Sequence, residues 1–425
     1  MKIAKLKIEK YAISLRVGFF LALRQVRRSS KYTNGLIIFV MVLTFLNLVV
    51  VRGILVGLLE GSTEAYRSKY AGDVLITNLP KKNFIENSPN IISVIQNMPW
   101  VESYSYRYVE GGEVEANYKS KIRMDEDSNS TAGSIVGINP ELEDAFSGMS
   151  LKLVEGRYMN KNDAEGILIG ANLLRKYLDI EAPGLTLLED VEVGDRVRLT
   201  VGGNRREFTV LGFLQSKVDQ IDFRIFVLDT TLRNMIGRSD YNVDEISVRL
   251  KSDTDPYMVK EALLRAGAGE TARVQTWDES LPKFLIDIQN TFGLLGNVVG
   301  SIGLAVASIT IFIVIFINAI TRRKFIGILK GIGIESRAIE MAYIFQSVFY
   351  AFMGIAIGFL VIYGFLVPFI DAHPIKFPFS DGILVAEVYN TSIRALLLMI
   401  ATIIAGYIPA RIVVKKNTLD SILGR

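Results

Sequence analysis

Two pairs of carboxylates come closer than any other residues of this chain to a pattern that could do chemistry. Asp125 and Asp127 lie in a polar stretch, and Asp219 and Asp222 lie three residues apart. Carboxylate oxygens at such spacing could ligate a metal ion. Solvated loop carboxylates are far commoner than metal ligands, so we predict no metal site at either pair.

Other side chains that carry enzymatic chemistry are scarce. The 425 residues include no cysteine and one histidine, His373. This excludes disulfides, cysteine-ligated zinc, thiol catalysis and iron–sulfur clusters, as well as multi-histidine metal sites and most His-dependent triads. The sequence also has no G-x-x-x-x-G-K-[ST], so it has no P-loop for ATP. We therefore expect a non-catalytic chain that holds no cofactor of its own.

Long apolar segments decide the class of protein instead. They cover residues 36–59, 292–320, 342–370 and 395–414. A bilayer core about 30 Å thick requires roughly 20 helical residues, so each segment is long enough to cross it. The second would form a helix roughly 43 Å long, and we expect it to project beyond the bilayer because apolar positions continue back to Phe284.

The distribution of charge predicts the orientation. Residues 1–35, 321–341 and 409–425 together carry 18 basic and 4 acidic residues, so by the positive-inside rule they face the cytoplasm. Residues 60–291 carry 27 basic and 37 acidic residues, and the loop 371–392 is also acidic. The sequence therefore predicts a multi-pass protein of the cytoplasmic (inner) membrane with both termini in the cytoplasm.

The predicted fold is an α-helical membrane protein with four transmembrane helices and a large α+β extracytoplasmic domain inserted between helices 1 and 2. The predicted divisions are a cytoplasmic amphipathic helix (1–33), transmembrane helix 1 (34–59), the outward domain (60–283), a stalk with transmembrane helix 2 (284–320), a cytoplasmic loop (321–340), transmembrane helix 3 (341–370), an outer loop (371–392), transmembrane helix 4 (393–414) and a cytoplasmic tail (415–425).

Alternating apolar residues and turn signals predict the elements of the outward domain. Strands are expected at 72–78, 101–109, 134–138, 166–170, 196–201, 207–213, 224–228 and 245–250, and helices at 60–70, 91–98, 171–177 and 256–265. Gly202-Gly203-Asn204 predicts a hairpin turn. The polar stretch 125–134 is expected to be a loop.

The N-terminal stretch mixes apolar and basic residues. Its apolar residues are Leu15, Phe19, Phe20, Leu23 and Val26, and its basic residues are Arg16, Arg24, Arg27 and Arg28. A helix on the inner membrane surface would bury the first set and present the second to anionic lipid. The alternative is a cytoplasmic extension of the first span.

Small and polar residues within the spans predict helix packing. Gly296 and Gly300, and Gly354 and Gly358, place small residues on one face of a helix, where close approach favours association in lipid. No Asp, Glu, Lys or Arg lies deep within spans two to four, which argues against ion-coupled transport. Four spans also enclose too little volume for a pore within a single copy.

In the cytoplasmic loop 321–343, a group of basic residues is followed by apolar positions and then by Gly331 and Gly333. This pattern predicts a short amphipathic helix, a glycine turn and a second helix that leads into the third span. Such an element is either a protein-docking surface or a turn on the membrane surface, and composition favours neither.

The same loop resembles the signature R-x-x-E-I-G-I-L-K-A-L-G of MacB/LolC/FtsX permeases, the mechanotransmission class of ABC transporters. It reads RRKFIGILKGIG over residues 322–333, with Phe325 in place of the usual Glu and Gly331 in place of Ala. Further segments resemble the family: Ala22-Leu23-Arg24 with Arg27-Arg28 before the first span, Gly406-Tyr407-Ile408-Pro409-Ala410 through Leu419 at the close, and Gly72-Asp73-Val74, Val136-Gly137-Ile138, Glu155-Gly156-Arg157, Val193-Gly194-Asp195 and Val210-Leu211-Gly212 in a MacB-like periplasmic core.

The resemblance implies that the loop is a coupling helix seated in a groove of a separate cytoplasmic ABC ATPase dimer, which binds ATP and Mg. The implied contact residues are Arg322, Arg323, Lys324, Phe325, Gly327, Leu329, Lys330, Gly331 and Gly333. Charge reversal at Arg323 and Lys330 is then expected to weaken ATPase association. A second permease copy, identical or not, and membrane lipid are further implied partners, with a periplasmic adaptor or substrate protein also allowed and no nucleic acid.

The implied function is that of a permease subunit that converts ATP hydrolysis by its partner into movement of the outward domain. That movement would export or extract amphiphilic substrates such as lipoproteins, peptides or drugs. One alternative is an FtsX-like transducer that regulates an extracytoplasmic cell-wall hydrolase or a sensor without transport. Another is a membrane-anchored receptor or adhesion domain that has no ATPase.

Overall fold

The computed structural model describes residues 2–118, 128–178, 184, 186–373, 375–376, 381–382 and 384–415. Asp125, Asp127, Leu419 and all of the tail except Lys415 lie outside this range. The chain divides into two compact units, and each is described by itself. The membrane unit comprises residues 1–59, 287–376 and 381–425, and the outward domain comprises residues 60–286 with 377–380.

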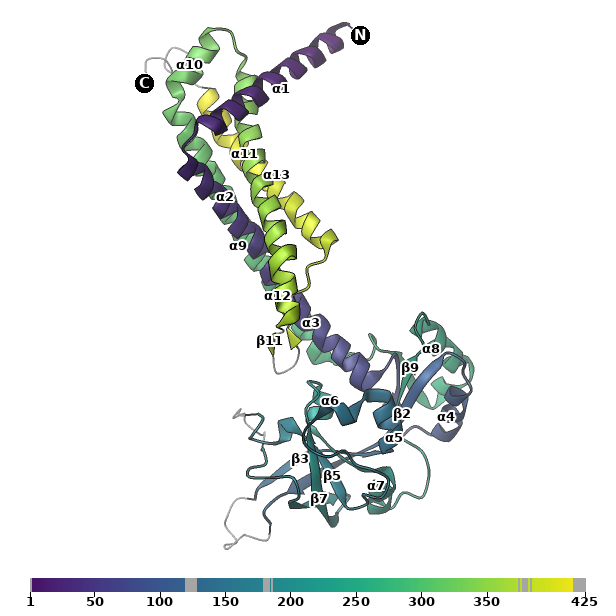
Figure 1. The fold of residues 1–425 in the computed structure, drawn as a ribbon. Coiled ribbons are helices and arrows are strands. Elements are labelled where there is room, and N and C mark those ends of the chain that lie inside the picture. Colours follow the sequence, from purple (N-terminus) through teal and green to yellow (C-terminus); the bar gives the residue numbers. More distant parts are fainter. Residues whose placement is uncertain are drawn as a thin grey trace. The chain divides into compact units, whose positions relative to one another are not determined.

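The helices of the membrane unit account for the long apolar segments (Figure 1). They are α1 (Lys2–Arg28), α2 (Lys31–Leu46), α3 (Arg52–Tyr66), α9 (Lys283–Thr321), α10 (Arg323–Gly331), α11 (Ser336–Val361), α12 (Val367–Ala372) and α13 (Val388–Val414). Helical runs at Lys31–Ala71, Lys283–Thr321, Ser336–Ala372 and Val388–Val414 are long and apolar enough to cross a membrane. The four predicted spans are confirmed, and each helical run begins before the apolar segment that predicted it.

Two of these spans contain π-helical turns. Asn47–Val51 joins α2 to α3, and Ile362–Leu366 joins α11 to α12. The helix is interrupted between α1 and the first span, because Ser30 has φ −57° and ψ 129° and is not helical. The first span is therefore not continued by α1 as one helix.

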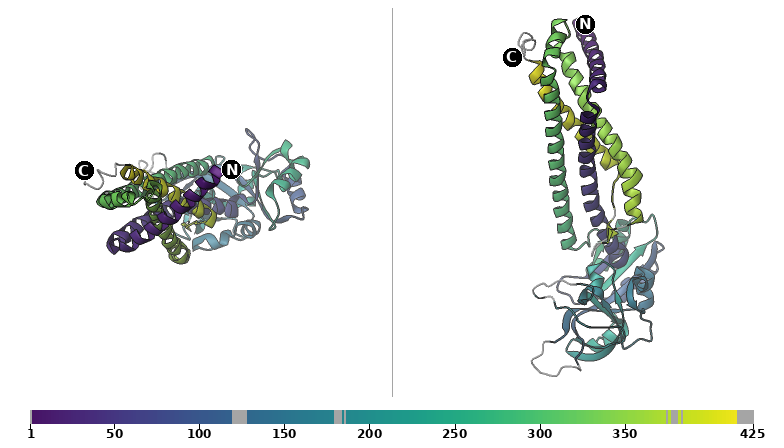
Figure 2. Two further views of the ribbon diagram at one scale, coloured as in Figure 1. Left: turned by 90° about the horizontal axis from the view of Figure 1, so that it is seen from above. Right: turned by 60° about the vertical axis from the view of Figure 1, so that its left-hand side comes forward.

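The packing of the membrane unit is centred on α11, which lies alongside α1, α2 and α13 (Figure 2). Its core contains buried Met41 and Phe45 of α2, Ile311 of α9, and Tyr343 and Tyr350 of α11. One polar group inside it is bonded across helices, since the Tyr350 hydroxyl donates to Asn34 Oδ1 over 2.7 Å. Such bonds meet the requirement of a polar group that lies away from water.

The outward domain is built on a mixed sheet flanked by helices (Figure 1). Its described strands are β1 (Val74–Asn78), β2 (Val101–Glu115), β3 (Ser130–Ile138), β4 (Leu153–Gly156), β5 (Gly166–Gly170), β6 (Arg196–Val201), β7 (Asn204–Leu214), β8 (Arg224–Leu228), β9 (Glu245–Leu250) and β10 (Ala272–Thr276). They pair in the order β10-β1-β9-β2-β3-β8-β5-β7-β4, and β6 pairs with β2 and β7. The long strand β2 joins two halves, because its first residues pair with β9 and its last residues with β3 and β6.

Five helices accompany the sheet within the described residues: α4 (Ser88–Gln96), α5 (Pro140–Ser147), α6 (Asp219–Asp222), α7 (Asp229–Ile236) and α8 (Pro256–Arg265). One apolar core, with Ile76 and Phe208 among its members, includes residues of α4 and α8, and a second includes Tyr66, Tyr70 and Phe226. The hairpin prediction is confirmed, since Val201 pairs with Asn204 across Gly202 and Gly203, both of which have positive φ.

Some predictions for this domain are wrong. The helix expected at 171–177 is a 3-10 turn at Ala171–Leu173, after which Leu174 leaves the helix to bridge to Leu188. The loop expected to run to residue 134 ends at Ser130, because the polar residues 130–134 pair with Gly111–Glu115 of β2. Helices α5 and α7 and strands β4 and β10 were not expected.

Candidate functional site

The cytoplasmic loop forms the predicted helix, turn and second helix. Helix α10 spans Arg323–Gly331, and the Ile334 N–H donates to the Leu329 carbonyl over 3.0 Å after the helix has ended. Gly333, which lies between α10 and α11, has φ +93°, a left-handed conformation that residues with a Cβ rarely adopt. The glycine at this position therefore allows the chain to reverse into α11.

Helix α10 has one buried and one exposed apolar face. Ile326 and Leu329 are buried in the core of the membrane unit. Phe325, Ile328 and Ile332 are 49%, 52% and 71% exposed. We call these three the exposed stripe of α10. Ile332 directly follows the helix, and its N–H donates to the Ile328 carbonyl over 3.0 Å, so the spacing of three and four residues still places all three on one face.

Two polar contacts join the ends of this loop to other helices. The Lys330 ammonium donates to the Val414 carbonyl at the end of α13. At the start of α11, Glu335 Oε2 accepts a hydrogen bond of 2.9 Å from the Ser14 hydroxyl of α1. The loop is thereby joined to the first and last helices of the membrane unit.

The predicted ATPase-contact residues lie on different faces of α10. Lys324, Phe325, Gly331 and Gly333 are exposed, and Arg322 and Arg323 are partly buried. Gly327 and Leu329 face the core, and Lys330 binds Val414, so charge reversal at Lys330 would break a contact within this chain. Ile328 and Ile332 were not among the predicted contact residues, although their spacing of three and seven residues from Phe325 indicates a shared helix face.

Helix α1 packs through a narrow face. Ser14, Gly18, Ala22 and Gln25 are buried, and a Cβ on Gly18 would lie 2.8 Å from the Cβ of Met341 on α11. Arg16, Arg24, Arg27 and Arg28 are exposed, and so are Leu15, Phe19, Phe20 and Leu23. Contact of these exposed groups with lipid stays a prediction.

The glycines predicted to pack helices differ in how tightly they are held. A Cβ on Gly354 would lie 2.5 Å from Met41 Cβ, and one on Gly358 would lie 2.4 Å from Phe45 Cδ1, so α11 and α2 are in backbone-close contact. On α9, a Cβ at Gly296 or Gly300 would lie 3.4 Å from its nearest neighbour, which is ordinary contact. Sequence reasoning did not select Gly406, although a Cβ there would lie 1.9 Å from Ser347 Oγ.

In the outward domain, a buried ion group surrounds Tyr70, which follows α3. Its members are Arg107, Glu143, Arg224 and Glu245. Arg107 donates to Glu143 over 2.7 and 2.9 Å and to the Tyr70 carbonyl over 3.1 Å. Arg224 donates to Glu245 over 3.0 Å and to the Tyr70 hydroxyl over 3.3 Å.

The charges of this group balance one another. The side chains of Arg107 and Glu143 are 2% and 0% exposed, so each depends on the other for compensation. Burial opposes ionisation of Glu245, yet Arg224 and Arg107 hold the pKa of Glu245 below its usual value. Burial raises the pKa of the Tyr70 hydroxyl, which therefore stays protonated and donates or accepts hydrogen bonds as a neutral group.

Asp222, one member of the described acidic pair, has a structural role. Asp222 accepts hydrogen bonds from the Ser216 N–H over 2.6 Å, the Ser216 hydroxyl over 2.8 Å and the Lys217 N–H over 2.7 Å. Burial nevertheless raises the pKa of Asp222 to about 6. Among the described residues no three His, Cys, Asp or Glu side chains are grouped so that they could hold a metal ion.

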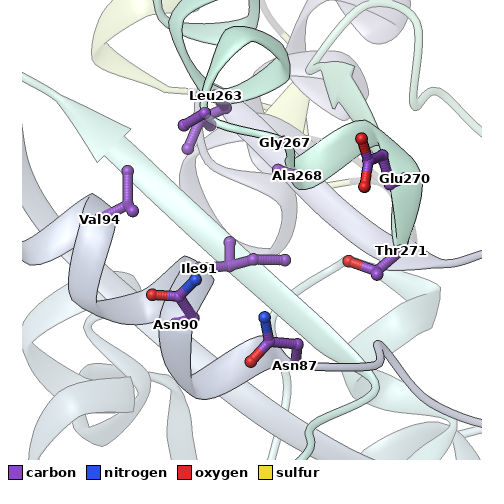
Figure 3. Close-up of a pocket in the computed structure, with 10 residues that line it drawn as sticks. Asn87, Asn90, Ile91, Val94, Leu263, Gly267, Ala268, Glu270 and Thr271 are labelled. Atoms are coloured by element: carbon purple, nitrogen blue, oxygen red, sulfur yellow. The ribbon is translucent and has the colours of Figure 1, made fainter.

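The outward domain also contains a small cavity between α4 and α8 (Figure 3). It has a volume of about 190 Å³ and is lined by Ile91, Val94 and Leu263 with the polar side chains of Asn87 and Glu270. Cavities that enclose drug-sized ligands are about 300–1,000 Å³. The cavity is therefore too small to enclose a drug-sized ligand, and it indicates no function.

Comparisons with known proteins agree with this architecture. Residues 36–266 match the MacB-like periplasmic core domain and residues 297–418 match the FtsX-like permease C-terminal domain. An uncharacterised ABC transporter permease of Methanocaldococcus jannaschii is 25% identical over 366 residues, which are 83% of this chain and 85% of that protein. The macrolide export ATP-binding/permease protein MacB of Agrobacterium fabrum is 27% identical over 198 residues, 45% of this chain but only 29% of that protein.

Solved structures with similarity include the periplasmic region of MacB from Actinobacillus actinomycetemcomitans, at 16% identity and a TM-score of 0.35, covering 50% of this chain and 92% of that one. The extracellular domain of the noncanonic ABC-type transporter YknZ from Gram-positive bacteria has 16% identity and a TM-score of 0.31. This match covers 48% of the present chain and 99% of the YknZ domain. The first family match covers more than half of the chain, and the second covers the remaining spans in the expected order. The chain belongs to the MacB/FtsX family of ABC transporter permeases.

Proposed function

We propose that this chain is a permease subunit that converts ATP hydrolysis by a separate ATPase into movement of its outward domain. The observation that carries the proposal is the exposed stripe of α10. A helix that buries one apolar face and leaves Phe325, Ile328 and Ile332 exposed is suited to bind a second protein. In this proposal ATP and Mg²⁺ are bound by the partner, and the stripe enters its groove.

The helices offer a path for the motion. Lys31–Ala71 and Lys283–Thr321 are continuous helical runs that are 41 and 39 residues long, and each contributes residues to both units of the chain. In the outward domain, the first run ends at the buried ion group, where Arg107 binds the Tyr70 carbonyl. Displacement of these helices at the cytoplasmic side would move the domain as a rigid body.

The proposed orientation places both termini and α10 in the cytoplasm and the outward domain outside, as the positive-inside rule predicts. The proposed substrates are amphiphiles such as lipoproteins, peptides or drugs, and two permease copies with two ATPases form the working unit. A transducer that regulates a cell-wall hydrolase or a sensor, without transport, would use the same coupling and is the alternative.

The test is to purify the full chain with the ATP-binding subunit that it retains and to measure ATPase activity in nanodiscs. We expect an ATP-binding subunit to co-purify and its ATPase rate to rise several-fold when lipopeptides or amphiphilic drugs are added. Co-purification without stimulation by any amphiphile would favour the transducer. Absence of an ATP-binding subunit from the purified complex would overturn the proposal.

A further inference from the structure

The first span contains a π-helical turn between two regular helices. The turn covers Asn47–Val51, between α2 and α3. Before it, Met41 and Phe45 of α2 are fully buried against glycines of α11. A π-helical turn interrupts the regular hydrogen bonding of an α-helix and is found frequently at functional sites and at kinks. A change of direction in this span is therefore easiest at the turn.

After the turn, the first span is held by a short segment that precedes α13, residues 384–386, which we call the strap. The Val385 N–H donates to the Gly53 carbonyl of α3 over 3.2 Å. A Cβ on Gly53 would lie 2.8 Å from Leu384 Cδ1 and 2.8 Å from the Val385 carbonyl oxygen, so glycine allows the close approach. Leu384 is 4% exposed. A hydrogen bond and a buried apolar side chain therefore join the strap to α3.

The other end of the strap is attached to a second π-helical turn. This turn covers Ile362–Leu366, between α11 and α12. Its Tyr363 hydroxyl donates to the Ala386 carbonyl over 3.0 Å and lies 3.0 Å from Oγ1 of Thr391, a fully buried residue of α13. The strap thus joins the first span to the third and fourth spans. It meets the first and third spans at or next to the places where they depart from α-helical geometry.

The π-helical turn of the first span also contains an unsatisfied polar group. Within the described part of the chain, the buried Oδ1 atom of Asn47 has no hydrogen-bond partner. A Cβ on Gly303 of α9 would lie 2.9 Å from this oxygen, so α9 packs against it. A buried acceptor without a donor is costly, and native structures keep few of them. A second arrangement of the turn that supplies a donor would remove this cost.

We propose that the turn Asn47–Val51 is a hinge and that the strap is a latch, which holds α3 in its present position. When the strap leaves Gly53, α3 turns about the hinge while α2 stays packed on α11. Helix α9 follows α3, because Arg52 Nη1 donates to Asn297 Oδ1 over 2.8 Å. This inference goes beyond the proposed function, and its test does not require the ATPase.

Distances between spin labels test the proposal in the full-length protein in nanodiscs, since a chain without cysteine takes labels only at introduced positions. The pair L59C/Y389C reports on α3 relative to α13, and the pair F39C/I400C reports on α2 relative to α13. G53A adds a methyl group against the backbone of the strap, so we expect a longer L59C/Y389C distance to become the major one. The F39C/I400C distance should not change.

The variant L384A should weaken the latch without adding bulk. Truncation of a buried leucine removes most of its burial free energy, so the ratio of the short to the long L59C/Y389C distance should fall about 30-fold. The matched controls are G35A on α2, whose added Cβ would have no described atom within 4 Å, and L396A, which truncates a leucine that is 60% exposed on α13. Both should keep the distance of the unmodified chain.

An unchanged L59C/Y389C distance in either G53A or L384A would overturn the latch. A change of equal size in the F39C/I400C distance would overturn the hinge, because the whole bundle would then have loosened.

Discussion

The exposed stripe of α10 makes a quantitative prediction about ATPase binding. We consider the double variant I328A/I332A, whose residues are 52% and 71% exposed in the chain alone. Fully burying an isoleucine contributes about 1.5–3 kcal/mol, so covering the exposed fractions contributes about 1 and about 1.5 kcal/mol. Alanine keeps one methyl group, so the loss is about 2 kcal/mol, or about 30-fold in Kd.

The assay is titration of the ATP-binding subunit onto the immobilised, detergent-solubilised permease. I309A is the matched control, because Ile309 is 58% exposed on α9 in the middle of a span and undergoes the same chemical change. Its Kd should equal that of the unmodified chain. L329A provides a contrast, because Leu329 is 7% exposed and its truncation should lower the unfolding temperature rather than act on binding alone.

Binding by I328A/I332A that is as tight as that of I309A would refute the assignment of the stripe to the ATPase interface. A loss of affinity in I328A/I332A would also refute the assignment if the unfolding temperature of this variant fell as far as that of L329A, since the variant would then have lost its fold.

Three further predictions concern the outward domain and the stalk. E143A leaves Arg107, which is 2% exposed, without its carboxylate, and should lower the free energy of unfolding by about 3–5 kcal/mol in denaturant titrations; a loss below about 1 kcal/mol would contradict the role of the ion pair. Burial raises the pKa of Asp222 to about 6, so the protonated carboxyl contributes fully to stability below about pH 4, and this contribution is lost as the pH rises through 6. Between pH 5 and 7 the free energy of unfolding should therefore fall by about 1 kcal/mol. The unfolding midpoint of D222N should lack this dependence on pH, whereas an unchanged dependence would assign the titration to another group. T291P places a proline in α9 beyond its first turn and should kink the helix there, so ATP hydrolysis should persist while stimulation by substrate is lost, with T291A as control and normal stimulation in T291P as the opposing result.

Local patterns predicted those features that depend on neighbours in sequence. Periodicity and turn chemistry act over a few residues. They therefore predicted the four apolar helices, the strand at 196–201 and the Gly202–Gly203 hairpin. The sequence also contains a signal for helix α5 that the prediction did not use, since Asn139 caps this helix and Pro140 occupies its first turn.

Other features depend on which surfaces meet, and no local pattern records this. The spacing of Phe325, Ile328 and Ile332 shows that they share a face, but only the packing of α10 shows that Ile326 and Leu329 take the buried side. The buried ion group joins residues as far apart as Arg107 and Glu245, which lie opposite each other where β2 pairs with β9. The predicted helix at 171–177 failed for the same reason, since a bridge to Leu188 outweighed local helix preference.

The bond from Lys330 to the Val414 carbonyl determines the directions in which the loop is able to act. A helix that only rests on its neighbours transmits compression and separates from them under tension. If α10 binds the ATPase as proposed, these two bonds would couple a displacement of α10 in either direction to α13 and, through Glu335, to α1. Return of α10 would then also move helices to which it is not directly linked along the chain.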